Sequence, residues 1–333
     1  MIENNQKIDI AEDELLKKYP DILKILLCDH STKLNIFWAT DNYKELGYQY
    51  TFSSPIKAEL ITGINNRVIT PRILKNKEVR NSRIKNMAEV YTPAWVCNEQ
   101  NNKIDEAWFG RKNIFNKTKE RNGAGIFWVT NLNKIVFPKN KNWKDYINNK
   151  RLEITCGEAP YITSRYDTTT GEFIPVVDRI GILDRKLRII SENINDSKSW
   201  VSVAQNAYKS TYAYEWQGDS LLLAREAMLY TFIENYFLKF KKNPPVSSLR
   251  SIAKIISWNV WQMDGLTGTT PLSCSEENES TRNIFDEIEV RKKKCEGCSG
   301  LDISLHNGSH CIIKDWEKKK GKGREIKFID ILK

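Results

Sequence analysis

The sequence contains no run of about 18 apolar residues, so it predicts no transmembrane helix and no membrane partner. The first ten residues, MIENNQKIDI, are polar and acidic, unlike a signal peptide. Long exact repeats are also missing. We therefore expect a cytoplasmic protein in a reducing compartment, where the seven cysteines serve as thiols or metal ligands rather than as disulfides.

A surplus of positive charge stands out in the composition. The 333 residues carry a formal net charge of +10, which favours polyanions as partners, nucleic acid first and anionic membranes second. The many Lys and Asn residues have an alternative explanation in the base composition of an A+T-rich genome. The 40% hydrophobic content, with 10 Trp, 13 Tyr and 12 Phe, suffices for a sizeable core.

The chain divides into three predicted parts. Residues 1–85 are a mixed N-terminal region, and residues 86–270 are the predicted cofactor-binding domain. Residues 271–333 hold a Cys/His insertion at 295–311 and two closing strands. From residue 150 onward, predicted strands alternate with predicted helices. That order is typical of an α/β fold with a mostly parallel sheet, whose ligands bind at the carboxyl ends of the strands.

Apolar spacing and turn residues predict the individual elements. A helical pattern at 9–28 is interrupted by Pro20, and Thr92 is expected to cap a helix with Pro93 in its first turn. Residues 75–83 are a basic run, either a solvated helix face or a phosphate-contacting arm, and 111–122 are a polar basic linker. The other predicted helices are 179–190, 200–208, 219–240 and 249–257. Strands are predicted to start at 152 and to span 34–40, 126–129, 134–137, 211–216, 259–264, 311–313 and 326–332.

Three acids stand at predicted strand ends. Glu153 precedes the turn around Gly157, Glu215 ends the next strand, and Asp264 ends the third. In a parallel sheet these ends lie along one edge. An ionised carboxylate accepts hydrogen bonds through two oxygens, so it suits the two hydroxyls of a ribose or the exocyclic amine of an adenine. The turn itself has one glycine where a dinucleotide fingerprint has three, so an ordinary strand–turn–helix corner is the alternative.

Four segments in this order resemble the adenine-N6 DNA methyltransferases, or M subunits, of bacterial restriction-modification systems. AEVYTPAWV at 88–96 is similar to the Thr-Pro segment before their cofactor strand, and LEITCGEAPY at 152–161 is similar to their first cofactor motif. YAYEWQGDSLLLARE at 212–226 and NVWQMDGL at 259–266 are similar to the ribose-binding and adenine-contacting segments. The resemblance covers about residues 85–266. It implies a Rossmann-like fold that binds S-adenosylmethionine.

The resemblance also implies a role for eight residues. Thr92 and Pro93 would approach the methionine end of S-adenosylmethionine. Its amino-acid part would be surrounded by Glu153, Cys156, Gly157 and Glu158. Glu215 would hold the ribose, and Asp264 would meet the adenine.

The catalytic motif of that family, Asn or Asp followed by two prolines and an aromatic residue, is not found after Asp264. Asn243-Pro244-Pro245 reads instead as a helix stop. At the expected place stand Asp315 and Trp316, an acid and an aromatic that could accept a proton donor and stack on an extruded base. Their alternative reading is a surface acid beside a packing tryptophan. A second subunit that supplies target recognition or catalytic residues is therefore an expected partner, together with DNA.

A Cys/His group near the C-terminus predicts structural zinc. Cys295 and Cys298 have C-x2-C spacing, and His306 and His310 have H-x3-H spacing, with Cys311 able to replace either histidine. Zinc would give this polar insertion a fold that it cannot obtain from an apolar core. The alternative is a flexible insertion with incidental thiols.

Three functions are candidates, of which the resemblance implies the first two and a residue pattern suggests the third. The first is an S-adenosylmethionine-dependent adenine-N6 DNA methyltransferase, or the M-type subunit of one. The second is a catalytically silent, methyltransferase-like DNA-binding or scaffold subunit. The third is a restriction nuclease with the pattern D-x(n)-E-x-K, in which Asp302 or Asp315 precedes Glu325 and Lys327.

Overall fold

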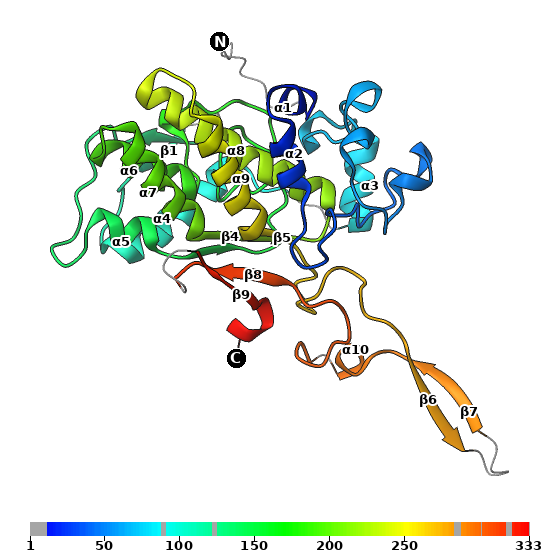
Figure 1. Cartoon of the computed structure of the whole chain (residues 1–333). Coiled ribbons are helices and arrows are strands. Elements are labelled where there is room, and N and C mark those ends of the chain that lie inside the picture. Colours follow the sequence, from blue (N-terminus) through cyan, green and yellow to red (C-terminus); the bar gives the residue numbers. More distant parts are fainter. Residues whose placement is uncertain are drawn as a thin grey trace.

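The computed structural model describes residues 12–87, 91–121, 125–282, 288–300, 302–317 and 322–332. The chain is mixed α/β, with helices around small sheets (Figure 1). Part of the N-terminal helical pattern, together with residues 88–90 of the Thr-Pro segment, lies outside the described residues.

A three-stranded parallel sheet lies at the centre of the chain. It consists of β3 (Arg151–Glu153), β4 (Thr211–Glu215) and β5 (Val260–Gln262), with β4 in the middle. Helices α6 (Ile182–Asn193) and α7 (Ser197–Lys209) connect β3 to β4. Helices α8 (Gly218–Phe240) and α9 (Val246–Asn259) connect β4 to β5. The alternation of strands and helices predicted from residue 150 onward is thus confirmed.

Each face of this sheet packs against a different core. Because side chains alternate along a strand, Ala213 and Val260 point into the main core, while Tyr214 and Trp261 point the other way. The main core includes apolar residues of α7, α8 and α9. The second core is covered by the antiparallel pair β8 (Ile312–Asp315) and β9 (Arg324–Lys327), on the side of the sheet away from these helices (Figure 1).

The N-terminal region shares the main core. Helices α1 (Glu12–Lys18) and α2 (Pro20–Leu27) are separated by one residue, and Pro20 starts the second helix. Apolar residues of α2 and α9 belong to one buried cluster. The predicted strand at 34–40 forms isolated bridges only. The main-chain N–H and C=O of Phe37 instead pair with the side-chain amide of Gln262, at 3.0 and 2.8 Å.

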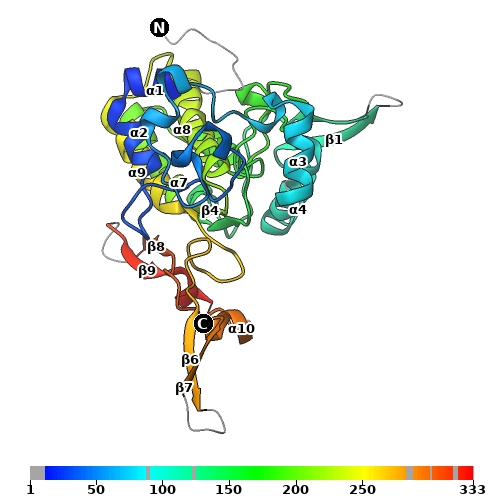
Figure 2. The same ribbon diagram turned by 90° about the vertical axis from the view of Figure 1, so that its right-hand side faces the viewer.

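Two hairpins extend from this body (Figure 2). The first pairs β1 (Asn116–Arg121) with β2 (Gly125–Thr130), so residues 111–122 are not simply a linker. The predicted strand at 126–129 is confirmed as part of β2, but its partner is β1 and not the predicted strand at 134–137. The second pairs β6 (Glu277–Arg282) with β7 (Ile288–Lys293), in the stretch next to the Cys/His residues. The remaining α-helices are α3 (Lys77–Met87), α4 (Ala94–Phe109), α5 (Trp143–Asn148) and α10 (Glu296–Gly300).

Short 3-10 helices complete the described secondary structure. Five of them lie between α2 and α3, one precedes α6, and one follows β9. They are η1 (Lys44–Leu46), η2 (Tyr48–Tyr50), η3 (Ala58–Leu60), η4 (Gly63–Asn65), η5 (Arg72–Leu74), η6 (Val176–Asp178) and η7 (Phe328–Ile331).

Candidate ligand pocket and metal centre

A pocket of about 960 Å³ opens where β3 and β4 end. Its walls come from both strand ends, from the turn after β3, and from the first turn of α8. Five of the eight residues predicted to hold a cofactor line it, namely Thr92, Glu153, Cys156, Gly157 and Glu215. The pocket therefore lies at the carboxyl edge of the sheet, where parallel sheets bind ligands.

The turn after β3 has an unusual backbone. Thr155, Gly157 and Ala159 all have left-handed φ angles, of 46°, 53° and 57°. Glycine adopts this region freely, whereas threonine and alanine are held there by their surroundings. One such restraint is the hydrogen bond from the Cys156 N–H to the Tyr214 carbonyl, at 2.9 Å. The turn is consequently fastened to the end of β4.

Glu215 connects this turn to the start of α8. Its carboxylate accepts from the backbone N–H groups of Gly157 at 2.7 Å, Trp216 at 2.9 Å and Gln217 at 3.2 Å. Burial raises the pKa of Glu215 above its ordinary value, while these N–H donors act in the opposite direction. The carboxylate is thus fixed in place at the wall of the pocket.

Glu153 is the less satisfied of the two pocket acids. One of its oxygens accepts from the Tyr161 N–H at 3.4 Å, and the other is buried without a hydrogen-bond partner in the described part of the chain. Burial raises the pKa of Glu153 to about 8, although the N–H groups of Tyr161 and Ile162 act in the opposite direction, and nearby Glu215 adds to the rise. A ligand with an ammonium or hydroxyl group could supply the missing donor.

The other three residues predicted for the cofactor lie outside the pocket lining. Glu158 is buried and accepts from the Arg72 N–H at 2.7 Å and from the Tyr166 hydroxyl at 2.5 Å. Asp264 begins a turn beyond β5, where it accepts from the Leu266 N–H at 2.9 Å. Pro93 occupies the N-cap position of α4.

The cap of α4 comes from a distant loop. The Ala94 N–H donates to Asp167 at 2.8 Å, so Thr92 does not cap this helix as predicted. Asp167 also accepts from the N–H groups of Thr169 and Thr170, at 2.7 and 3.0 Å, and thereby orders its own loop. The sequence favours Thr92 because a capping residue next to its helix can be recognised from the sequence, whereas a cap supplied by a distant segment cannot.

Asp315 and Trp316, the predicted catalytic pair, lie at the opposite edge of the sheet. The Trp316 indole donates to the Asn259 side chain at 2.7 Å, and Asn259 directly precedes β5. Glu215 stands at the other end of the sheet, because parallel strands present their starts and their ends at opposite edges. The predicted catalytic pair therefore lies away from the pocket, and Trp316 packs and hydrogen-bonds as in the alternative interpretation.

The residues predicted for a nuclease do not form a metal group. On the β8–β9 pair, Asp315 faces Arg324 and Lys314 faces Glu325, so the two acids point to opposite faces. Asp302 lies in the insertion, where its carboxylate accepts from the Ser304 N–H at 2.8 Å. Among the described residues, the one group of three or more potential metal ligands is a Cys/His group.

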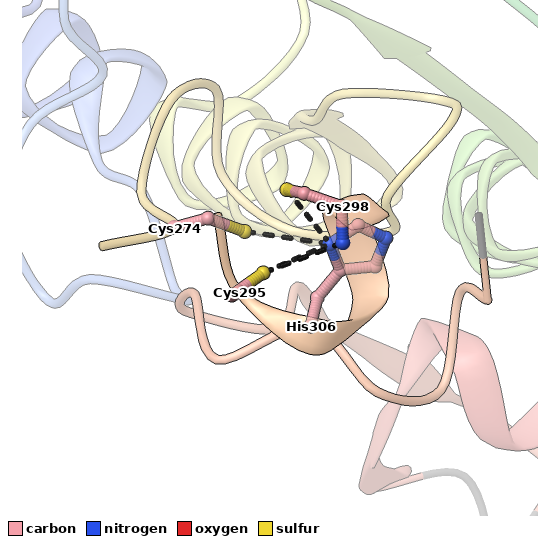
Figure 3. Close-up of side chains that lie close together, drawn as sticks. All are labelled: Cys274, Cys295, Cys298 and His306. Atoms are coloured by element: carbon pink, nitrogen blue, oxygen red, sulfur yellow. Dashed lines mark hydrogen bonds between the residues drawn. The ribbon is translucent and has the colours of Figure 1, made fainter. Parts of the chain in front are cut away.

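That group consists of Cys274, Cys295, Cys298 and His306, whose ligand atoms all lie within 4.8 Å of one another (Figure 3). The Nδ1 atom of His306 is 3.5 Å from the Sγ atoms of Cys274 and Cys298, and 3.8 Å from that of Cys295. Cys295 and His306 are buried, and the other two thiols are half-buried. Such a donor set could hold a metal ion.

The ligand set differs from the predicted one in three residues. His310 pairs by a backbone bridge with Thr269, and Cys311 donates its thiol to the Gln262 carbonyl at 3.3 Å, so neither belongs to the group. Cys274 takes the fourth position instead. It lies before the β6–β7 hairpin, and a long interval of this kind is invisible to a search for closely spaced ligands.

Sequence reading also missed several residues of the pocket. Tyr91 directly precedes Thr92, and Trp216 and Gln217 directly follow Glu215, and all three line the pocket. Their position next to predicted site residues was the available signal. Gln100 and Asn101 of α4 also line it, and they could be found only once the packing of that helix was known.

Comparisons with known proteins add no family to this description. No protein-family model, curated protein or solved structure matches the chain. In the part of the chain that the structure describes, no helix combines the length and apolarity needed to span a bilayer.

Proposed function

We propose that the pocket binds S-adenosylmethionine and that the protein is the methyltransferase, or M-type, subunit of a restriction-modification system acting on adenine N6 in DNA. One observation carries the proposal. Three segments that are far apart in the sequence line a single pocket at the carboxyl edge of a parallel sheet, through Thr92, through Glu153 and Gly157, and through Glu215. The net charge of +10 supports a polyanionic substrate.

The two acids would hold different ends of the cofactor. Glu215, at the end of the middle strand, would accept from the ribose hydroxyls. Glu153 would pair with the ammonium group of the methionine part through its buried, unpartnered oxygen. An ammonium at this place would also favour the ionised carboxylate and lower the raised pKa of Glu153.

The methyl-accepting side is less complete. S-Adenosylmethionine would supply the methyl group to N6 of an extruded adenine and would leave as S-adenosylhomocysteine, and the N6 proton would pass to a base or to solvent. Asp315 and Trp316 lie at the far edge of the sheet and cannot receive that adenine beside the pocket. We assign the groups that hold the adenine to a partner subunit.

The position of Asp315 and Trp316 away from the pocket also favours a second candidate function. A subunit that retains the cofactor pocket without a methyl-accepting site would bind DNA or hold a complex together without transferring a methyl group. Methylation of DNA by the reconstituted complex separates the two candidates. N6-methyladenine detected by mass spectrometry supports the first, and bound cofactor without methylated DNA supports the second.

Calorimetry with a pair of ligands tests the pocket. S-Adenosylmethionine and 5′-methylthioadenosine share the nucleoside, but only the first carries the ammonium that Glu153 would hold. Glu153→Gln should weaken the first ligand about tenfold, the size of a lost charged hydrogen bond, and leave the second nearly unchanged. Equal weakening of both would contradict the assigned role of Glu153, and no binding of either ligand to the unsubstituted protein would overturn the proposal.

A matched pair of surface variants tests the location. Ile154 lines the pocket and is 62% exposed, so Ile154→Trp should obstruct part of the cavity without disturbing the core. Ile64 is fully exposed and lies outside the pocket lining, which makes Ile64→Trp the control. Loss of binding in the first variant alone places the ligand in this pocket, and equal affinities would place it elsewhere.

A further inference from the structure

The three contacts of the His306 Nδ1 atom cannot all be hydrogen bonds. This atom lies within 3.8 Å of three thiol sulfurs at once. An imidazole nitrogen carries either one proton or one lone pair, so it can form a hydrogen bond in the ring plane with only one of the three sulfurs. The other two sulfurs then have no hydrogen bond to this nitrogen. Three sulfurs and a nitrogen gathered at these distances are explained by a cation between them.

The spacing fits zinc. Bonds of about 2.3 Å to sulfur and about 2.0 Å to nitrogen at tetrahedral angles place each sulfur about 3.5 Å from the nitrogen. The three separations found here are 3.5, 3.5 and 3.8 Å. Calcium and magnesium take oxygen ligands, which this group lacks, whereas three thiolates and one imidazole are a common zinc set.

The surrounding backbone is built closely around the four ligands. A Cβ atom added at Gly297 would lie 2.5 Å from the His306 backbone nitrogen, and one added at Gly308 would lie 2.9 Å from the backbone nitrogen of Cys274. The Cys298 N–H points at the Cys295 sulfur, 3.4 Å away, an arrangement that stabilises a thiolate. Glycine at these two positions therefore permits the close approach of three separate segments.

We propose that Cys274, Cys295, Cys298 and His306 bind one zinc ion that folds the insertion between β5 and β8. Four protein ligands leave no open position for water, so the site is structural rather than catalytic. Cys274 precedes the β6–β7 hairpin and the other three follow it, so the metal closes the base of that hairpin. Beyond the base, the hairpin projects from the body (Figures 1 and 2).

Zinc would replace a hydrophobic core in this segment. Among the described residues between Met263 and Cys311, Cys295 is the one buried side chain of the apolar class. The remaining order comes from polar contacts, such as the Asn307 amide, which donates to the Ser275 carbonyl at 3.0 Å. A segment with so little apolar burial needs another source of folding free energy, and metal binding supplies it.

Metal content of the full-length protein and its variants tests the proposal. Protein purified with zinc should contain one zinc ion per chain by elemental mass spectrometry, and cobalt substitution should give the visible absorption of a tetrahedral thiolate site. Cys274→Ser should lose the metal, because it removes one of four ligands. His310→Ala should retain it, although C-x2-C and H-x3-H spacing points to His310 as a ligand.

Cys28→Ser is the matched control for Cys274→Ser, because Cys28 is also half-buried and does not belong to the group. Full zinc content in Cys274→Ser, or no zinc in the unsubstituted protein, would overturn the proposal. If Cys274→Ser does not fold, hydrogen exchange of the unsubstituted protein decides. Chelation should increase exchange in residues 264–311 and leave β3 to β5 protected, and unchanged exchange throughout would overturn the structural role.

Discussion

The body around the parallel sheet and the insertion between β5 and β8 are held together by different means. The body buries a continuous set of apolar side chains from α2, α7, α8 and α9. The described residues of the insertion bury almost none, and gather three thiols and an imidazole instead. Within one chain, a region can thus obtain its shape from core packing or from a metal, and the two should respond to different perturbations.

The two regions also differ in the burial of their polar side chains and hydrogen bonds. In the body, the fully buried Arg225 guanidinium donates to the main-chain carbonyls of Leu26, Cys28, Ser257 and Val260. It thereby joins the ends of α2 and α9 to β5. Burial lowers the pKa of Arg225 to about 10, which still leaves it charged at neutral pH. In the insertion, the comparable hydrogen bonds of Asn307 are exposed to water.

Arg225→Leu should produce the largest loss of stability. It leaves four carbonyls, three buried and one half-buried, without this donor, and we expect the free energy of unfolding to fall by about 3–5 kcal/mol. Denaturant unfolding followed by tryptophan fluorescence measures this. Arg324→Leu, at an exposed position of β9, is the control and should change little. A loss below about 1 kcal/mol in Arg225→Leu would mean that water hydrogen-bonds to these carbonyls in the variant, and that solvent enters the body more easily than its packing indicates.

Three glycine-to-alanine substitutions compare the regions directly. A Cβ atom at Gly218 would lie 2.1 Å from the Phe37 carbonyl, and one at Gly297 would lie 2.5 Å from the His306 nitrogen. Gly218→Ala should destabilise the body by about 1–3 kcal/mol. Gly297→Ala should weaken zinc binding and leave the unfolding of the body unchanged. Gly300 has open space around its Cα, so Gly300→Ala should affect neither property.

Calorimetric zinc titration and denaturant unfolding of all three variants provide the measurement. If Gly297→Ala lowers the free energy of unfolding of the body as much as Gly218→Ala does, the insertion and the body form one cooperative unit. The distinction between core packing and metal binding would then fail for this protein.

The body could be predicted from the sequence because its elements have apolar periodicity. Helix α8 was predicted at 219–240 and spans Gly218–Phe240, and β4 was predicted at 211–216 and spans Thr211–Glu215. The clustering of Glu153 and Glu215 followed from the rule that parallel strands end along one edge. Asp264 is an exception to this rule, because the chain turns away directly after β5.

The parts that were missed lack a local pattern. Strand β1, Asn116–Arg121, has the sequence NKTKER with no apolar alternation, and its partner β2 holds mostly exposed side chains. Cys274 and Cys295 are brought together by a hairpin whose charged sequence gives no sign of pairing. Both cases depend on contacts outside the core, which single-sequence patterns do not record.

The pH dependence should have opposite signs in the two regions. The pKa of Glu153 is raised to about 8, so the folded body retains a proton that the unfolded chain releases above its ordinary pKa of 4.5. Its contribution to stability is complete below pH 4.5 and is lost as the pH rises through 8, by up to about 1.4 kcal/mol per pH unit. Zinc binding to thiolates instead weakens as the pH falls.

Unfolding of the body at a series of pH values, with Glu153→Gln alongside, isolates this contribution. The variant should lack the part of the slope between pH 4.5 and 8 that Glu153 causes. Zinc titrations over the same range should show affinity rising with pH. Parallel slopes for the unsubstituted protein and Glu153→Gln would show that Glu153 ionises normally and that its buried oxygen reaches water.

The smallest effect distinguishes the two edges of the sheet. Trp316→Phe removes the 2.7 Å hydrogen bond to Asn259 and should cost about 1 kcal/mol, without changing ligand affinity at the pocket. Trp216→Phe removes a similar bond, from the indole to the Ala39 carbonyl at 3.1 Å, but Trp216 lines the pocket. Both variants should therefore lose similar stability, and only Trp216→Phe should bind S-adenosylmethionine differently in calorimetry. If Trp316→Phe alone changed the affinity, the far edge of the sheet would have to communicate with the pocket, and the assignment of the methyl-accepting groups to a partner subunit would lose its basis.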